Sequence, residues 1–374
     1  MKALVLHDVA NLEVRDVPDA VAGPRQVLVR PTTVGVCGTD FQIFDGKANY
    51  HTDAAGRQVP LSKSPQILGH EICGVVESAG TGVSGLERGA MVVVDQGWNC
   101  SSHGKPLCEY CSTGDTHQCE FYQEHGITGI PGAMAELVAV PAVNVVAVPP
   151  GVPAQLAVLT EPLGCVLHSI DVARKMPLRY RLEQAETVLI CGAGPAGLLF
   201  LQVLRNVFGY SGRLLVAEPN PRKRRLAESW GATVIDPSAE DLVEAVLRLT
   251  HNRRADWIIE ASGSAGVFVR IPGLARKQAT VVLYGHGHSG VDLSVLNNVQ
   301  FTEPFLVAAT GASGDLDGEG RPTTYRRALD LIASGAVKVD PILTHTSRRL
   351  EDLPVIFARH RFEPDFVKGA LVVE

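Results

Sequence analysis

A glycine-rich turn near the middle of the chain constrains the fold more than any other feature. The run Gly192-Ala193-Gly194-Pro195-Ala196-Gly197 follows an apolar stretch at 187–190 and opens a helical pattern at 196–207. In such a turn the first glycine permits a tight bend, the second lets the backbone approach a pyrophosphate, and the third lets the helix pack on the strand. The helix N-terminus then favours the bound anion. The pattern predicts a dinucleotide site formed by Gly192, Gly194, Pro195, Ala196 and Gly197.

An acidic residue closes the next predicted strand. Glu218 stands about twenty residues beyond the last glycine, where a carboxylate accepts hydrogen bonds from the adenosine ribose hydroxyls and repels a 2′-phosphate. The basic run Arg222-Lys223-Arg224-Arg225 follows and allows two interpretations, a solvated helix face or a clamp for the 2′-phosphate of NADP. Because the carboxylate is expected nearest to the ribose hydroxyl, NAD is predicted rather than NADP.

Strands and helices alternate from about residue 155 to residue 305, which predicts βαβ units on a parallel sheet. The first 150 residues hold short β-type runs separated by glycine and proline instead. After Phe305 the chain returns to mixed short elements, with a helical stretch at 325–334 and a final strand at 369–374. The predicted fold class is therefore α/β, with one β-rich domain and one dinucleotide-binding domain.

Composition and charge exclude several classes of partner. The net charge is −6 and the isoelectric point is about 6.1, so no basic surface for nucleic acid is expected. The apolar stretch near the N-terminus is too short for a signal peptide, and no apolar run is long enough to cross a membrane. We expect a cytoplasmic protein without a membrane or nucleic-acid partner, whose clustered cysteines bind metal rather than form disulfides.

Ligands for a catalytic metal lie upstream of the glycine turn. Cys37-Gly38-Thr39-Asp40 offers a thiolate, Gly69-His70-Glu71 an imidazole and a carboxylate, and Glu161-Pro162-Leu163 a second carboxylate. A catalytic zinc takes three protein ligands and leaves one position for water or substrate. Taken singly, each residue is better explained as a buried cysteine, a core histidine or a surface glutamate. Because the chain also contains a dinucleotide turn, the cysteine, histidine and glutamates taken together are better explained as the ligands of a metal.

Together these motifs resemble the zinc-containing medium-chain dehydrogenase/reductase family, in particular its polyol and threonine dehydrogenase branch, over nearly the full chain. The resemblance implies a GroES-like catalytic domain formed by residues 1–155 and 306–374, with a Rossmann NAD(P)-binding domain, residues 156–305, inserted between them. It implies a catalytic zinc held by Cys37, His70 and either Glu161 or Glu71. Family members are commonly homodimers or homotetramers, so a homo-oligomer is expected.

The resemblance also implies a proton relay, from which this chain departs. In the family the proton passes first to a hydroxyl at the position of Thr39 and finally to a histidine three residues on. This chain has Gln42 there, and a glutamine does not accept a proton near neutral pH. A chain of water molecules or a residue such as His51 would have to replace the histidine.

A second cysteine cluster resembles the structural zinc lobe of the same family; its members are Cys100, Cys108, Cys111 and Cys119. The last three have the usual spacing, whereas an insert, Ser101 to Lys105, separates the first two. A closed four-cysteine site would stabilise a lobe that has little hydrophobic core of its own. His103 and His117 are alternative ligands if the insert displaces Cys100.

The predicted function is zinc-dependent hydride transfer between a secondary alcohol of the polyol, cyclitol or diol type and NAD. The partner is then a small-molecule alcohol or ketone. The polar insert 47–63 either borders the substrate cleft or forms a solvent loop or an oligomer contact. Two alternatives stay open: a zinc-free reductase of the same superfamily that acts on activated double bonds, and a non-catalytic, zinc-stabilised binding protein on this fold.

Overall fold

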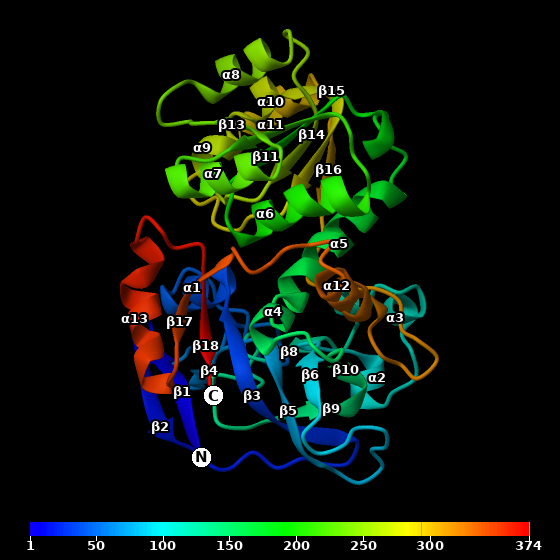
Figure 1. The fold of residues 1–374 in the computed structure, drawn as a ribbon, viewed down its shortest axis with the longest axis vertical. Coiled ribbons are helices and arrows are strands. Elements are labelled where there is room, and N and C mark those ends of the chain that lie inside the picture. Colours follow the sequence, from blue (N-terminus) through cyan, green and yellow to red (C-terminus); the bar gives the residue numbers. More distant parts are fainter. Residues whose placement is uncertain (293, 374) are drawn as a thin grey trace. The chain divides into compact units, whose positions relative to one another are not determined.

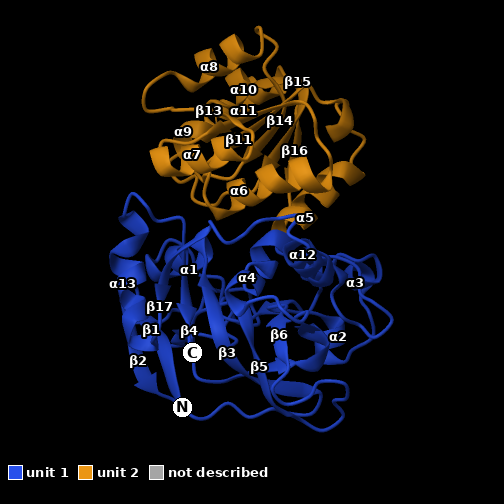
Figure 2. Ribbon diagram, in the orientation of Figure 1, with its two compact units in different colours: residues 1–164, 311–374 blue, residues 165–310 orange. Residues whose placement is uncertain are grey.

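The computed structural model describes residues 1–292 and 294–373, and these divide into two compact units (Figures 1 and 2). Unit 1 contains residues 1–164 and 311–374, and unit 2 contains residues 165–310. The domain boundaries expected from the sequence, at 155/156 and 305/306, remain predictions. The second compact unit extends past 305 because strand β16 (Phe305–Ala308) continues its sheet.

Unit 1 is rich in short strands. They are β1 (Lys2–Asp8), β2 (Asn11–Asp16), β3 (Gln26–Val36), β4 (Gln66–Ile67), β5 (Glu71–Ala79), β6 (Met91–Val94), β7 (Gly97–Trp98), β8 (Gln123–Glu124), β9 (Val138–Pro141), β10 (Val145–Ala147), β17 (Leu343–Ser347) and β18 (Lys368–Val372). In the described part of the chain the largest sheet has seven strands, ordered β10-β6-β5-β3-β18-β17, with β9 also pairing with β3. The final strand was expected at 369–374; it is observed as β18, and Glu374 lies outside the described residues.

Most helices of unit 1 are short and lie in the connections. They are α1 (Gly38–Phe44), α2 (Cys100–His103), α3 (Glu109–Ser112), α4 (Ala154–Ala157), α12 (Thr323–Ala333) and α13 (Leu353–Ala358). A longer helix, α5 (Thr160–Lys175), begins in unit 1 and ends in unit 2. Helix α12 confirms the helical stretch that was predicted at 325–334.

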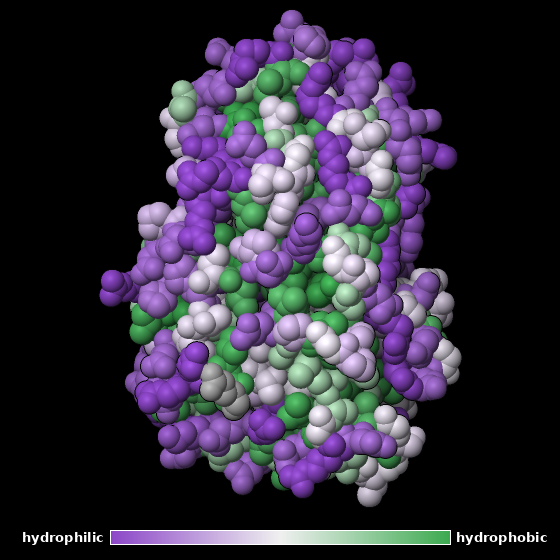
Figure 3. Space-filling model, in the orientation of Figure 1, coloured by the Kyte–Doolittle hydropathy of each residue, from purple (hydrophilic) through white to green (hydrophobic). Residues whose placement is uncertain are grey.

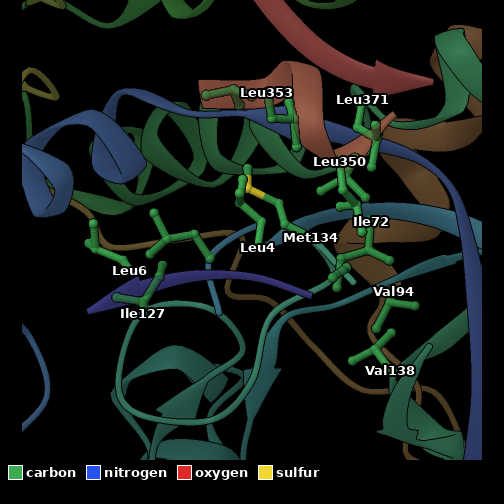
Figure 4. Close-up of a cluster of buried hydrophobic side chains, with 14 of the residues drawn as sticks. Leu4, Leu6, Ile72, Val94, Ile127, Met134, Val138, Leu350, Leu353 and Leu371 are labelled. Carbon is green, nitrogen blue, oxygen red and sulfur yellow. The ribbon is translucent and has the colours of Figure 1, made fainter. Parts of the chain in front are cut away.

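The two ends of the chain share the core of unit 1. β1 contributes Leu4 and Leu6, β5 contributes Ile72, and β18 contributes Leu371 to one cluster of buried side chains, in which Met134 lies beside Leu4 (Figure 4). β18 pairs antiparallel with β3, so the C-terminal strand lies inside the sheet rather than at its edge. The core of unit 1 is therefore complete only when the C-terminal part of the chain returns to this unit.

Unit 2 contains a parallel sheet. In its described residues the sheet has six strands: β11 (Thr187–Cys191), β12 (Arg213–Ala217), β13 (Thr233–Ile235), β14 (Ala255–Glu260), β15 (Ala275–Leu283) and β16. Every pair is parallel, and the order β13-β12-β11-β14-β15-β16 is that of a Rossmann fold. All five residues of β11 are buried, as expected for a strand that is covered on both faces. The predicted α/β class is confirmed.

Helices connect the strands of unit 2: α6 (Pro195–Gln202), α7 (Pro221–Ser229), α8 (Leu242–Leu249), α9 (Ala265–Phe268), α10 (Ile271–Leu274) and α11 (Val295–Gln300). Of the described helical segments, one, Ala154–Lys175, is long and apolar enough to cross a membrane. However, 83% of its most apolar window is buried inside the structure, as in the core helix of a globular protein. The face drawn in Figure 3 shows hydrophilic residues interspersed with hydrophobic ones.

Candidate metal and coenzyme sites

The first candidate site lies in unit 1, where Cys37, His70 and Glu71 place ligand atoms within 4.8 Å of one another. Cys37 follows β3 and caps α1, whereas His70 immediately precedes β5, which Glu71 begins. β3 and β5 are antiparallel neighbours, with Gly35 opposite Glu71. The pairing of these strands therefore brings together two segments that are about thirty residues apart in sequence.

Asp40 connects the two ligand segments. Its carboxylate is fully buried and accepts a hydrogen bond from the backbone N–H of Cys37 at 2.8 Å and from that of Gly69 at 3.4 Å. The same carboxylate lies 3.5 Å from Nδ1 of His70, which leaves Nε2 for a metal. Burial lowers the pKa of His70, but the charges of Asp40 and Cys37 outweigh burial and raise that pKa well above its usual value.

Glu71 forms a buried ion pair with the C-terminal strand. Nζ of Lys368, on β18, lies 2.6 Å from Oε1 of Glu71 and also donates to the carbonyl of Val36. β5 and β18 flank β3, so the two side chains meet across it at Gly35, where any Cβ would overlap Oε2 of Glu71. Burial lowers the pKa of Lys368, but the charges of Glu71 and then Cys37 raise it overall.

Glu161, the other predicted carboxylate ligand, is not part of the compact group. It lies in the first turn of α5, and its Oε1 accepts a hydrogen bond of 3.1 Å from Nε2 of Gln96. The structure therefore brings three of the four predicted ligands together and holds the fourth by a separate contact.

This donor set fits a divalent metal. A thiol, an imidazole and a carboxylate converge, which is a combination that zinc accepts. Oε2 of Glu71 is buried and has no hydrogen-bond partner in the described part of the chain. The three buried carboxylates of Asp40, Glu71 and Glu161 outnumber the buried cationic groups of Lys368 and His70, and a divalent cation would compensate the excess.

Of the residues considered for the predicted proton relay, Thr39 lies beside this group. The hydroxyl of Thr39 is 3.8 Å from Sγ of Cys37, and Gln42 lies one turn further along α1. The ring of His51 lies against Gly129, where a Cβ would stand 2.6 Å from its Nε2. Nδ1 of His51 is buried and has no hydrogen-bond partner among the residues that the structure describes.

Tyr50, in the polar insert at 47–63, lies within electrostatic reach of Cys37. The pKa of the Tyr50 phenol is raised, first by burial and then by the negative charges of Glu124 and Cys37. Since a charge on Cys37 affects Tyr50, this loop lies within electrostatic reach of the metal group. The observation favours the interpretation of the insert as a border of the substrate cleft.

The second candidate site is a cavity of about 510 Å³ in unit 2, bordered by the glycine turn, by Glu218 and Lys223 and by Ser262. Gly192 has φ +95°, a left-handed conformation that favours glycine, and a Cβ at Gly197 would overlap the carbonyl oxygen of Gly192. A Cβ at Gly194 would meet nothing within 4 Å, so this position opens into the cavity. Pro195 and Ala196 form the first turn of α6. This geometry provides the free helix N-terminus that a pyrophosphate requires.

Glu218 connects the end of β12 to the glycine turn. Its Oε2 accepts a hydrogen bond from the N–H of Ala193 at 2.7 Å, and its Oε1 accepts one from Asn220 at 2.8 Å. From the basic run that follows, Lys223 lines the cavity, whereas Arg224 forms an ion pair of 2.7 Å with Asp236. Arg222 and Arg225 are exposed. Most residues of this basic run are therefore either exposed on the surface of a helix or paired with another residue of the chain.

The third candidate site is the cysteine lobe. The sulfur atoms of Cys100, Cys108, Cys111 and Cys119 all lie within 4.8 Å of one another. The insert forms the short helix α2, which ends at Gly104 in a left-handed conformation, and the chain then returns to Cys108 without displacing Cys100. Backbone N–H groups of Cys111 and Glu120 lower the pKa of Cys108 to about 6, which favours the thiolate that binds metal.

Neither alternative histidine belongs to this group of sulfur atoms. Nε2 of His103 bonds to the carbonyl of Phe121 at 2.9 Å. Nε2 of His117 lies 3.3 Å from Asp95, and burial lowers its pKa while the charge of Asp95 raises it overall. The geometry therefore favours four cysteines as the ligands of the lobe.

Several residues that complete the first site were not predicted from the sequence as site residues. Asp40 lies within the cysteine motif and could have been identified from it. Lys368 could not, because it is 297 residues from Glu71 and becomes its neighbour only through sheet order. Gln96 and Tyr50 also belong to no sequence motif that would have indicated a role at the site.

Comparison with known proteins supports the same interpretation. Residues 23–150 match the alcohol dehydrogenase GroES-like domain, and residues 195–335 match the zinc-binding dehydrogenase domain. The chain is 32% identical to L-threonine 3-dehydrogenase of Pyrococcus abyssi over 90% of this chain and 87% of that protein. It is 30% identical to erythritol/L-threitol dehydrogenase of Mycolicibacterium smegmatis, over 92% and 90% of the two chains.

Solved structures share the fold over the whole chain. A crystal structure from Sinorhizobium meliloti 1021 that contains NADP has a TM-score of 0.81 and 29% identity, and it covers 99% of this chain and 98% of its own. Alcohol dehydrogenase TADH from Thermus sp. ATN1 has a TM-score of 0.79 and 24% identity, with 100% of both chains covered. The relatives are dehydrogenases, so this chain is an oxidoreductase of the alcohol dehydrogenase type. It belongs to the zinc-containing medium-chain dehydrogenase/reductase family.

Proposed function

We propose that the protein is a zinc- and NAD-dependent dehydrogenase that oxidises a secondary alcohol of the polyol type. The observation that carries the proposal is the convergence of a thiol, an imidazole and a carboxylate at Cys37, His70 and Glu71. In this proposal Cys37 and His70 hold the zinc, and either Glu71 or Glu161 supplies the carboxylate.

The chain's own residues prepare this site for an alcohol. When bound, the zinc would supply a Lewis acid that lowers the pKa of a substrate hydroxyl, and NAD would supply a hydride acceptor. Asp40 orients the ring of His70, and Lys368 holds the carboxylate of Glu71. Burial of these groups excludes water and strengthens their electrostatic effect on the reacting oxygen.

The hydroxyl of Thr39 is the proposed first proton acceptor, because it lies beside Cys37. Gln42 cannot continue the relay, since an amide has no suitable pKa. The proposed exit is a water chain, with His51 as the alternative proton acceptor. The buried Nδ1 of His51, which has no hydrogen-bond partner in the described part of the chain, supports this role.

NAD is the proposed coenzyme. The carboxylate of Glu218 borders the cavity and would repel a 2′-phosphate, and Arg224 is already paired with Asp236. Lys223 is the residue that would favour NADP instead, and the related structure from Sinorhizobium meliloti contains NADP. The choice between the coenzymes depends on which of these opposite charges dominates.

The substrate class is inferred from the relatives and from the loop near the metal. The names of the relatives include a hydroxy amino acid, a four-carbon polyol and, in Pseudoalteromonas atlantica, a deoxy sugar acid. The loop at 47–63 carries Tyr50, whose phenol lies within electrostatic reach of Cys37. A small substrate with more than one hydroxyl group fits both observations.

One experiment tests these proposals together. Purified zinc-loaded protein is incubated with a panel of tetritols, hexitols, cyclitols, diols and hydroxy amino acids, with NAD and NADP in parallel, and the absorbance of the reduced coenzyme is followed. We expect turnover with at least one polyol and a preference for NAD. Turnover of activated double bonds alone, or none with coenzyme and metal both bound, would favour the zinc-free reductase or the non-catalytic protein.

A homo-oligomer is also proposed, and the edge of the parallel sheet supports it. β16 is the last strand in the sheet order, and Leu306 on it is 46% exposed. Phe301, just before this strand, is 80% exposed. An edge strand that has no second strand neighbour among the described residues, and that carries exposed apolar side chains, favours pairing with a second copy. Analytical ultracentrifugation of the protein and of Leu306→Arg tests this, with dissociation expected for the variant.

A further inference from the structure

A buried carboxylate at the end of β14 connects two loops of unit 2. Glu260 is the last residue of β14 and is fully buried. Its Oε1 accepts hydrogen bonds from the backbone N–H groups of Ser262 at 2.9 Å and Gly263 at 3.1 Å, and from the hydroxyl of Ser262. Nε2 of His288 lies 2.7 Å from the other carboxylate oxygen, Oε2. Glu260 therefore joins the loop that follows β14 to the loop that follows β15.

The chemistry of Glu260 determines what His288 does in this contact. An ionised carboxylate only accepts hydrogen bonds, so Nε2 of His288 must carry the hydrogen. The imidazole is 22% exposed, and the centre of its ring lies 5.1 Å from that of Phe268 on α9. The aromatic neighbour and the buried carboxylate together restrict the orientation of the ring. His288 thus holds its loop to the end of β14 by a directed hydrogen bond.

The backbones of the two loops also approach each other closely. A Cβ at Gly285 would stand 2.3 Å from the backbone nitrogen of Gly263 and 2.7 Å from Oε2 of Glu260. The carbonyl of Glu260 accepts hydrogen bonds from the N–H groups of Tyr284 at 2.9 Å and Gly285 at 2.8 Å. Because the backbone and the carboxylate of one residue contact both loops, Glu260 sets their positions together.

Both loops lie where a Rossmann fold binds a dinucleotide. The sheet order places β11 next to β14, and the crevice between the carboxyl ends of these strands is the topological switch point. Ser262 borders the coenzyme cavity, and a Cβ at Gly192 of the glycine turn would stand 3.1 Å from the Cα of Ser262. A dinucleotide lies across such a crevice, with one nucleotide on each half of the sheet.

We propose that His288, held by Glu260, is a positioning residue for the nicotinamide half of the coenzyme. The proposal rests on the proposed use of a nicotinamide coenzyme. Glu218 follows β12 and borders the cavity, which assigns the adenosine half to the part of the sheet formed by β11, β12 and β13. The nicotinamide half is then assigned to β14 and β15, whose loops Glu260 and His288 join. Loss of His288 should therefore weaken the binding of this half alone.

Binding measurements on the zinc-loaded protein test the proposal without reference to turnover. NADH is titrated by the fluorescence of its nicotinamide ring, and NADPH replaces it if the unchanged protein binds NADPH more tightly. AMP, which lacks the nicotinamide half, is titrated by calorimetry. We expect His288→Leu to weaken binding of the reduced coenzyme about tenfold and to change that of AMP by less than about twofold. His288→Gln should restore coenzyme binding to within about threefold, since its amide can replace Nε2 as the donor.

Glu260→Leu tests whether His288 acts through the carboxylate. This variant leaves the N–H groups of Ser262 and Gly263 without their acceptor at the border of the cavity. It should therefore weaken the binding of AMP and of the reduced coenzyme by about tenfold each. Adding His288→Leu to Glu260→Leu should change coenzyme binding by less than about twofold, because the contact is already lost. If Glu260→Leu does not fold, the two His288 variants still decide the proposal.

His345→Leu is the matched control. Nε2 of His345 lies 3.2 Å from a carboxylate oxygen of Glu363 in unit 1, so this variant removes a similar contact away from the coenzyme cavity. Its binding of AMP and of the reduced coenzyme should equal that of the unchanged protein. Thermal melting of each variant confirms that it is folded.

The outcomes distinguish the failure of this proposal from the failure of the proposed function. Equal coenzyme binding by His288→Leu and the unchanged protein would overturn the positioning role. An equal loss of AMP binding in His288→Leu would also overturn it, since His288 would then support unit 2 in general. A full additional effect of His288→Leu in the Glu260→Leu background would do the same. If the unchanged protein bound neither reduced coenzyme, the proposed function itself would be wrong.

Discussion

The two candidate metal sites of unit 1 are built in opposite ways. The group of Cys37, His70 and Glu71 is assembled by strand pairing and completed by Lys368 from the last strand, so the fold creates it. The cysteine lobe is local: its ligands all fall between residues 100 and 119, and its buried cluster consists of those cysteines with Tyr122 packed against them. A lobe of this kind, if it binds a metal through its cysteines, depends on that metal for its structure. Loss of metal should therefore affect activity at the first site and stability at the second.

The largest expected effect is at the first site. Cys37→Ser should lower the rate of alcohol oxidation by about 1000-fold or more, because a bound metal contributes several kcal/mol to the stabilisation of the transition state. Thermal stability should change little, since Cys37 is half-buried and the sheet remains intact. Initial rates and melting curves of the same preparation measure both. A variant that melts far below the unchanged protein would contradict this assignment of roles.

The matched variant in the lobe is Cys111→Ser. Cys111 is 4% exposed and lies among the other cysteines, so its loss should release one metal per chain and disorder the lobe. Rapid proteolytic cleavage between residues 100 and 120 measures the disorder. If the lobe instead resisted proteolysis as well as it does in the unchanged protein, its packing would not depend on metal.

The difference between a local site and a site assembled by strand pairing also explains which features could be predicted from the sequence. Strong local patterns gave the elements of unit 2: the apolar run before the glycine turn is β11, and the helical pattern after it is α6. The last part of the predicted helical stretch at 196–207 is instead a π-helical turn, Val203–Val207, which follows α6 and which no sequence pattern indicated. The cysteine lobe was also predictable as a group, because its ligands are close in sequence.

The first site was predictable only in part. Cys37, His70 and Glu71 lie in recognisable motifs, but the ion pair of Glu71 with Lys368 depends on β18 lying next to β3. The hydrogen bonds of Gln96 to Glu161 and of Tyr325 to Gln96 likewise depend on packing between elements far apart in sequence. A single sequence contains no local signal for such contacts. It therefore left the choice between Glu71 and Glu161 open.

The next prediction concerns the buried ion pair between Glu71 and Lys368, which the fold brings together at the first site. Lys368→Met should leave the buried Glu71 carboxylate without its partner and cost about 3–5 kcal/mol of unfolding free energy. Urea unfolding of the zinc-loaded protein measures the loss. The double variant Glu71→Gln/Lys368→Met should recover most of it, since no unpaired charge then remains. A loss below about 1 kcal/mol would mean that the metal alone compensates Glu71.

Acid should destabilise the hydrogen-bonded region around His125. β7 pairs with β8 there, Nε1–H of Trp98 donates to Nε2 of His125 at 2.8 Å, and Nδ1–H of His125 donates to the carbonyl of Pro131 at 2.7 Å. The neutral ring is thus fully bonded, and burial lowers its pKa from 6.5 to about 4. The unfolded chain takes up a proton below pH 6.5 while the folded protein resists it, so stability is lost as the pH falls toward 4.

This protonation should cost about 3 kcal/mol of unfolding free energy between pH 6.5 and pH 4. Urea unfolding at half-unit pH steps measures it, with His125→Gln as the variant that does not titrate. The variant should be less stable at pH 7 but should lose less stability over this pH range. Parallel curves for the two proteins would show that another group is responsible for the acid sensitivity.

The smallest expected effect concerns the alternative ligand of the lobe. Nε2 of His103 bonds to the carbonyl of Phe121, and its ring lies 5.4 Å from that of Trp98, so the side chain supports the insert from outside the sulfur group. His103→Ala should cost about 1 kcal/mol of stability, the value of one hydrogen bond, and leave the metal content unchanged. Elemental analysis and urea unfolding measure the two quantities. Loss of one metal per chain would instead identify His103 as a ligand, and the lobe would then no longer be a site of cysteines alone.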